Sequence, residues 1–178
     1  MKYFRVLLVV FFVSCNLTKE DKGHLNQFTE SDKLVLESAT EVIAQSSFVS
    51  LISVDQQGQP RARVMEFFQP DKAFVFWLGT NPKSRKVEQI KQNSKVTLHF
   101  FDQSKMAYVS LMGRAYIVED NAIKAKKFKK GWEQFYKNKT TDFTLIQFVP
   151  NDLEYIGILK GFTGDKVTWA PHKVVLRE

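Results

Sequence analysis

The residues best suited to chemistry lie between positions 79 and 93, in the stretch GTNPKSRKVEQIKQN. Lys83, Arg85 and Lys86 surround Ser84 at the point where an apolar run gives way to helical spacing. The free backbone N–H groups of a helix N-terminus bind anions, whereas cations placed there oppose the helix dipole. The stretch therefore indicates either a phosphate-binding site or an ordinary solvated helix start, and the spacing alone leaves both open.

The start of this helix is predicted from the residues that precede the cations. Thr80 or Asn81 is suited to the capping position, and Pro82 is suited to the first helical position. Residues 84–86 would then lie in the first turn, where their side chains and the backbone N–H groups can meet a single anion.

Other catalytic and metal-binding patterns are missing from the sequence. The histidines are His24, His99 and His172, and Cys15 is the single cysteine, so no pair has the spacing of a zinc site and we expect no metal. Neither a nucleophile elbow nor a P-loop nor a dinucleotide fingerprint occurs. His99 lies in an apolar segment, where a core or interface residue is expected rather than a catalytic base. Any enzymatic activity would therefore depend on a cofactor.

The elements that must position these residues are mostly strands. The chain has 178 residues, of which 44% are hydrophobic and 25% charged, as expected of one globular domain. A helix is predicted over 30–46, and strands over 48–55, 61–68, 74–80, 95–102 and 107–119, with two or three more within 143–161 and 166–177. These strands follow one another in hairpin order without helical crossovers. We therefore expect a mainly β fold, an antiparallel β-barrel with a few helices at its openings and edges.

A lysine-rich segment, AIKAKKFKKGWEQFYKNK over 122–139, is predicted to form an amphipathic helix. Its aromatic residues, Phe128, Trp132, Phe135 and Tyr136, recur at steps of four, three and one. The simplest interpretation is an apolar face on the core and a lysine face in water. Contact with anionic lipid headgroups is a second interpretation. Nucleic-acid binding is not expected, because no recognised motif accompanies the lysines.

The first residues, MKYFRVLLVVFFVSC, have the pattern of a secretory signal peptide over 1–14. The run before Cys15 resembles a bacterial lipobox, so we expect Cys15 to be lipidated and to anchor the protein to a membrane of the bacterial cell envelope, on the periplasmic or outer-membrane side. A polar tether would follow over 15–29, and the folded domain over 30–178. The alternatives are a wrongly assigned start codon and a buried first strand.

Three stretches resemble the FMN-binding split barrels of the pyridoxamine 5'-phosphate oxidase family, and above all its small general-stress-protein branch. They are RARVMEF, FVFWLGTNPKSRKVEQIKQNSKVTLHFFD and YVSLMGRAYIVED, and the resemblance covers roughly 31–161. It implies a six-stranded split barrel that forms a homodimer, with two FMN molecules at the dimer interface. The C-terminal stretch WAPHKVVLRE lacks the substrate motif of the vitamin-oxidising enzymes, so oxidation of pyridoxamine phosphate is not expected.

The same resemblance implies a set of FMN contacts. By position, these are Arg63 on the phosphate or ribityl chain, with Arg61 as an auxiliary; Val64, Met65 and Glu66 along the flavin through their backbone; Thr80 beside the cofactor; Ser84, Arg85 and Lys86 on the phosphate; and Trp132 on the partner's flavin.

Three hypotheses about function follow from the resemblance. The first is a lipid-anchored, dimeric, FMN-dependent oxidoreductase that acts on an unidentified small molecule and has a role in stress. The second is a carrier of flavin or haem without enzymatic activity, on the same barrel. The third is a degenerate barrel that binds nothing and serves as an interaction protein of the envelope.

Overall fold

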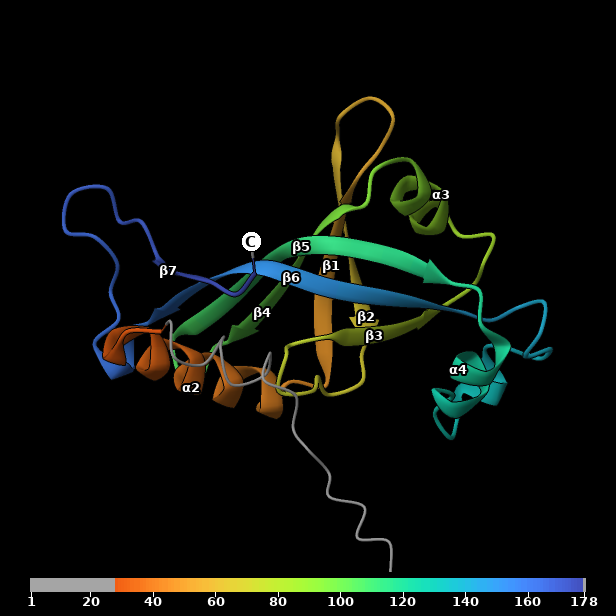
Figure 1. Cartoon of the computed structure of the whole chain (residues 1–178), viewed down its shortest axis with the longest axis horizontal. Helices are drawn as coiled ribbons and strands as arrows, with labels where there is room; N and C mark the ends of the chain where they lie inside the picture. The colour runs from red at the N-terminus through yellow and green to blue at the C-terminus, as the bar shows by residue number, and fades with distance from the viewer. Residues whose placement is uncertain (1–27, 178) are drawn as a thin grey trace, which may run out of the picture.

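The computed structural model describes residues 28–177, and seven strands of one antiparallel sheet dominate it (Figure 1). The predicted signal peptide, Cys15 and most of the tether lie outside these residues. In chain order the elements are α2 (Glu30–Gln45), β1 (Phe48–Val54), β2 (Pro60–Glu66), β3 (Phe76–Thr80), α3 (Arg85–Gln92), β4 (Lys95–Asp102), β5 (Ala107–Val118), α4 (Asn121–Lys126), the 3-10 helix η1 (Trp132–Gln134), β6 (Thr144–Gly157), the 3-10 helix η2 (Ile158–Lys160) and β7 (His172–Val175). No helix among them is long and apolar enough to cross a membrane.

The sheet closes on itself to form a split barrel. Its strands lie in the order β2-β1-β4-β5-β6-β3, and β7 pairs with β6 beyond that path. The two ends of this path, β2 and β3, meet through a single antiparallel bridge between Phe68 and Trp77, so the barrel is closed at one point and split elsewhere. The predicted antiparallel barrel is confirmed, and the sheet has seven strands where six were expected.

The core fills the barrel because side chains alternate along each strand. In β1 and β4 every second residue is buried, as expected of strands with one face on a core. Leu51, Leu98 and Leu111 are fully buried on three neighbouring strands, in register with one another. Helix α2 covers this core beside β4–β7 (Figure 1), and Thr29 caps it in a reciprocal box with Asp32.

The lysine-rich segment does not form the continuous helix that its spacing predicts. Helix α4 ends at Lys126, and Gly131, with φ of 95°, breaks the backbone before the short helix η1. The aromatic rings of the segment still turn inward, because Phe128, Trp132 and Tyr136 pack around Phe143, which lies beside β6. The predicted apolar face is therefore correct for these three rings and wrong for Phe135, which is 69% exposed, and a turn rather than a continuous helix presents it.

Candidate functional site

Helix α3 begins later than predicted. Its cap is Ser84, because Asn81 is occupied in a separate turn: its side-chain oxygen accepts from the backbone N–H of Lys83 at 2.8 Å, and its carbonyl accepts from that of Ser84 at 3.1 Å. Pro82 lies in this turn and not in the helix, so the prediction of Thr80 or Asn81 as cap and of Pro82 as first residue is wrong. Arg85 and Lys86 are the first two helical residues, and the Ser84 side chain makes no capping hydrogen bond.

The end of β3 contributes a buried hydroxyl next to these cations. Thr80 is only 3% exposed, and its Oγ1 accepts a hydrogen bond from Lys86 Nζ at 3.0 Å. Ser84 Oγ lies 3.4 Å from the same Thr80 oxygen. Thr80, predicted beside the cofactor, is therefore adjacent to Ser84 and Lys86 of the predicted phosphate set, and the turn between β3 and α3 holds the three together.

Arg63 approaches from β2 and is fixed in place by buried polar groups. Its guanidinium donates to Ser53 Oγ at 2.7 Å and to the Gln89 side-chain oxygen, and Ser53 itself donates to that oxygen at 2.7 Å. Ser53 and Gln89 are both buried, at 0% and 8% exposure. Because Gln89 belongs to α3, this network ties β1 and β2 to the helix whose first turn carries Arg85 and Lys86.

The cations of this site lack an anionic partner. Burial lowers the pKa of Lys86, and the nearby charge of Arg63 lowers it further. Burial likewise lowers the pKa of Arg63, with further contributions from Arg85 and Arg61. Among residues 28–177, no carboxylate forms an ion pair with Arg63, Arg85 or Lys86. Two positive charges, those of Arg63 and Lys86, are thus held near each other in partly buried positions, with the exposed Arg85 close by, which favours the binding of an anion.

Five of the predicted site residues line one open depression of about 460 Å³. They are Val64, Met65 and Glu66 of β2, Thr80 of β3 and Lys86 of α3. Sequence reasoning missed the other residues of its wall, which are Phe48, Gly79, Gln134, Phe135 and Tyr136; Trp132 completes the wall. The aromatic residues were visible as a stripe, but nothing in their spacing indicated which surface they would border.

Trp132 packs within the fold and lines the depression, and its contact with a partner's flavin stays a prediction. It is 5% exposed, and its indole N–H donates to the carboxylate of Glu66. Its ring packs against the backbone of Gly79, where an added Cβ atom would lie 2.2 Å from the nearest ring carbon. Gly79 is therefore required by this close approach, and Trp132 shapes the floor of the depression.

Four predicted site residues do not line the depression: Arg63, Ser84 and Arg85, which lie near its cationic residues, and Arg61, whose side chain bonds elsewhere. The Arg61 Nε donates to the Asp55 carboxylate at 2.8 Å, across the turn of the β1–β2 hairpin. The Arg61 guanidinium also holds the pKa of Asp55 below its usual range, together with backbone N–H groups of the turn. Arg61 therefore closes the hairpin and does not line the depression.

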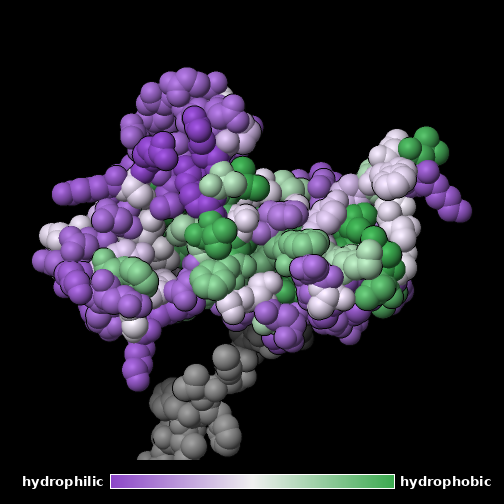
Figure 2. All heavy atoms as spheres, turned by 180° about the vertical axis from the view of Figure 1, so that it is seen from behind, coloured by the Kyte–Doolittle hydropathy of each residue, from purple (hydrophilic) through white to green (hydrophobic). Residues whose placement is uncertain are grey.

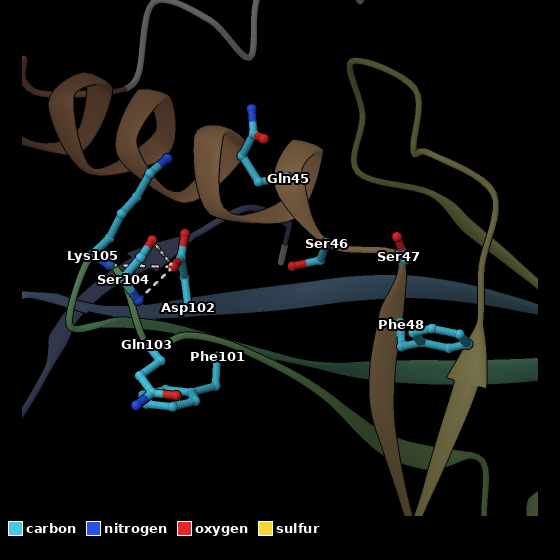
Figure 3. Close-up of a pocket in the computed structure, with 9 residues that line it drawn as sticks. All are labelled: Gln45, Ser46, Ser47, Phe48, Phe101, Asp102, Gln103, Ser104 and Lys105. Carbon is cyan, nitrogen blue, oxygen red and sulfur yellow. Dashed lines mark hydrogen bonds between the residues drawn. The ribbon is translucent and has the colours of Figure 1, made fainter.

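A second open groove, of about 630 Å³, lies between the end of α2 and the turn that joins β4 to β5 (Figure 3). Its lining residues are Gln45, Ser46, Ser47, Phe48, Phe101, Asp102, Gln103, Ser104 and Lys105. The Asp102 carboxylate accepts from the backbone N–H and the hydroxyl of Ser104, at 3.0 and 2.7 Å, so it stabilises the turn. None of the predicted site residues lines this groove.

Comparison with known proteins identifies the family. The family described as pyridoxamine 5'-phosphate oxidase matches residues 35–157. A pyridoxine/pyridoxamine 5'-phosphate oxidase of Vibrio atlanticus (strain LGP32) is 40% identical over 73 residues, which cover 40% of this chain and 34% of the relative. The matched part thus spans about a third of the length of such relatives.

Solved structures share the fold. A protein related to general stress protein 26, of the pyridoxinephosphate oxidase family, from Clostridium acetobutylicum has a TM-score of 0.67 and 28% identity, covering 80% of this chain and 94% of that one. A pyridoxamine 5'-phosphate oxidase-related, FMN binding protein from Nostoc punctiforme PCC 73102 has a TM-score of 0.59 and covers 85% of this chain and 99% of that one. At 11% identity the second likeness shows the fold alone. Because the family match extends over most of the sequence, this chain belongs to the pyridoxamine 5'-phosphate oxidase family.

Proposed function

We propose that this protein binds FMN in the depression between β2, β3, α3 and η1, and that it is a flavin-dependent oxidoreductase acting on a small molecule. The observation that carries the proposal is the group of partly buried cations, Arg63 and Lys86 above all, that has no carboxylate partner among the described residues. A phosphate monoester supplies the missing negative charge. The family resemblance makes FMN the phosphate ester that this site is expected to accept.

The residues present fit the phosphate of such a cofactor. Lys86, Arg85 and the Ser84 hydroxyl would hold it at the start of α3, with Arg63 on the same side. Two or three charge-assisted hydrogen bonds of about 1.5 to 3 kcal/mol each would supply much of the roughly 8 kcal/mol of a micromolar complex. The flavin, when bound, would supply the electron or hydride transfer.

A homodimer is part of the proposal, because the sheet has an uncovered apolar face. Phe48, Val64 and Phe101, on the neighbouring strands β1, β2 and β4, are 56%, 70% and 65% exposed. Figure 2, which views the molecule from behind, shows apolar side chains gathered across the middle of this side. Large exposed apolar areas of this kind mark interaction sites, and a second copy of the chain would cover this one.

The test compares FMN with riboflavin, which has the same ring and no phosphate. Each is titrated into the purified protein, and quenching of flavin fluorescence gives the dissociation constant. We expect FMN to bind at least tenfold more tightly than riboflavin, since the cations act only on the phosphate. Equal affinities would refute the phosphate site, and no binding of either would refute the flavin proposal. The dimer is tested separately, by comparing the sedimentation of the wild type with that of Val64→Glu, which places a charge on the exposed apolar face.

A flavin carrier is the second candidate. Glu66 is the only carboxylate that lines the depression among the described residues, and the Trp132 indole already occupies it, so no free proton donor or acceptor stands out there. Oxidation of a nicotinamide nucleotide in the presence of FMN would favour the enzyme, and stoichiometric FMN binding without turnover would favour the carrier.

Anchoring in the cell envelope also remains our proposal, from the pattern around Cys15. Intact mass spectrometry of the protein from a membrane fraction tests it. Acyl chains on a mature N-terminal Cys15 would support the lipid anchor, and an unmodified chain that begins at Met1 would refute it.

A further inference from the structure

The positive charge of the chain is concentrated in the lysine-rich segment over 122–139. The whole chain has 26 lysines and arginines against 19 aspartates and glutamates, which gives a net charge of +7. The segment holds seven lysines and one glutamate, so it accounts for +6 of that charge, and the other 160 residues together carry +1. A cluster of one sign attracts large anionic partners through its field.

The fold carries this segment at one end of the molecule, beyond the end of β5 (Figure 1). Seen from behind, this end is covered mostly by hydrophilic side chains (Figure 2). The Asp120 carboxylate caps α4 by accepting from the backbone N–H groups of Ala122 and Ile123, at 2.7 and 3.0 Å. Three aromatic rings of the segment pack around Phe143. The lysines thus extend from an ordered backbone, so binding to a surface costs little additional ordering.

Three of the seven lysines are engaged within the fold. Lys129 Nζ donates to a backbone carbonyl at 2.7 Å. Lys127 Nζ lies 4.8 Å from the centre of the Trp77 ring. Lys139 forms an ion pair with Glu133 at 3.8 Å. The protein itself therefore provides partners for these three charges.

Three other lysines, which we call the outer lysines, have no such partners. They are Lys126, Lys130 and Lys137, and all three are exposed. None of them forms a salt bridge with another residue of the described range, 28–177. None of them lines the depression assigned to FMN either. Their charges therefore serve neither the fold nor the proposed cofactor site.

The chemistry of the segment fits a lipid surface better than a nucleic acid. Its cations are all lysines, which carry a compact and strongly hydrated charge, whereas the planar fork of arginine is preferred for nucleic-acid recognition. A single-stranded nucleic acid would also need accessible aromatic faces on which its bases could stack. The segment offers none beside the outer lysines, because its rings pack on Phe143, except for Phe135, which lines the depression.

We infer that the outer lysines dock the protein on a bilayer that contains anionic lipid. Each lysine close to such a bilayer raises the affinity by about fivefold. The lipid anchor proposed at Cys15 would keep the domain near a membrane, since the twelve residues between Cys15 and Phe28 span at most about 45 Å. The docking adds to this anchor and depends neither on it nor on the binding of FMN.

The test uses the full chain with Cys15→Ser in every protein, so that no acyl chain contributes. Cosedimentation is measured with vesicles of phosphatidylcholine, alone or with about 30% phosphatidylglycerol. Vesicles without the anionic lipid report the binding due to the apolar run over 6–13, which all the proteins share. We expect the anionic vesicles to be bound at least tenfold more tightly, and the difference to disappear in about 0.5 M salt.

Replacing the outer lysines tests their part in this binding. The triple variant Lys126→Gln, Lys130→Gln, Lys137→Gln should bind anionic vesicles about 10- to 100-fold more weakly. Urea unfolding with an unchanged midpoint shows that the variant is folded. If the triple variant unfolds, the three single substitutions replace it, each with an expected weakening of about fivefold.

A second triple variant is the matched control for net charge. Lys72→Gln, Lys91→Gln, Lys166→Gln removes three exposed lysines that likewise form no salt bridge among residues 28–177, and it should change the binding little. An equal loss in both triple variants, or equal binding to both kinds of vesicle, would overturn the inference. Tighter binding of a short DNA duplex than of anionic vesicles at the same salt concentration would also overturn it, because the partner would then be a nucleic acid.

Discussion

Replacing Lys86 by methionine tests whether Lys86 binds the phosphate of FMN or is an ordinary surface lysine. Methionine keeps the length of the side chain and removes the charge that Arg63 repels. The loss of one charge-assisted hydrogen bond, about 1.5 to 3 kcal/mol, corresponds to a weakening of FMN binding by about 10- to 150-fold. Riboflavin affinity should change little, because it has no phosphate. Lys83→Met removes the same charge from an exposed position in the preceding turn and is the control.

The stability of the FMN-free protein provides a second measurement on the same variant. Methionine loses the hydrogen bond to Thr80, worth about 0.5 to 1.5 kcal/mol, but it also removes a partly buried charge. We therefore expect the free energy of unfolding to stay within about 1 kcal/mol of the wild type, although FMN binding is weakened. A lysine with a purely structural role would give the opposite result, a clear loss of stability at unchanged FMN affinity.

The pH dependence of this stability follows from the sign of the pKa change. Because the pKa of Lys86 is lowered in the folded state, the unfolded chain binds more protons between that lowered pKa and 10.5. The free energy of unfolding should therefore rise with pH through this interval in the wild type, relative to Lys86→Met. Urea unfolding of both proteins at a series of alkaline pH values measures the difference and cancels contributions that they share, such as those of the tyrosines. A flat difference would refute the assigned electrostatics.

Three further changes test the rest of the site and the sheet. Gly79→Ala should destabilise the protein by about 1 to 3 kcal/mol in urea unfolding, because its Cβ would overlap the Trp132 ring. Trp132→Phe should cost about 1.5 to 3 kcal/mol, and a double-mutant cycle with Glu66→Leu, which removes the acceptor, should assign most of it to their hydrogen bond. Burial lowers the pKa of His99, so stability should fall as pH decreases through 6.5, and His99→Gln, which can keep a bond to Ser110, should lack this fall.

The strands were predictable because their signal is local. The strand over 95–102 has the predicted bounds. A half-buried strand alternates apolar and polar residues, and this pattern can be recognised from neighbouring positions alone. The lysine-rich segment has an equally regular pattern, yet its rings pack on Phe143, and Gly131 supplies the positive φ that ends any helix there. Spacing shows that residues share a face, but not whether a helix or a turn presents it.

The two arginines of β2 illustrate a second limit of sequence reasoning. Arg61 and Arg63 are two positions apart and so point to the same side of the strand. Arg61 is paired with Ser53 in the hairpin, yet its side chain bonds Asp55 in the turn, whereas the Arg63 side chain reaches diagonally to Ser53 and to Gln89 of α3. Arg61 thus has a structural role, whereas Arg63 is held near the candidate site. The three-dimensional contacts of each side chain decide its role, and the residue type does not.

The departures from ordinary sequence rules converge on one place in the fold. Arg85 and Lys86 at the start of α3 oppose the helix dipole, and the charge of the partly buried Arg63 helps to lower the pKa of Lys86. Neither feature stabilises the empty protein. Natural sequences retain such conflicts chiefly where function requires them. A ligand with two negative charges would turn the repulsion into attraction, so the same residues that weaken the free protein would give the complex much of its affinity. The stability gained on adding FMN should therefore exceed that gained with riboflavin at the same free ligand concentration, because the tighter ligand stabilises the folded protein more.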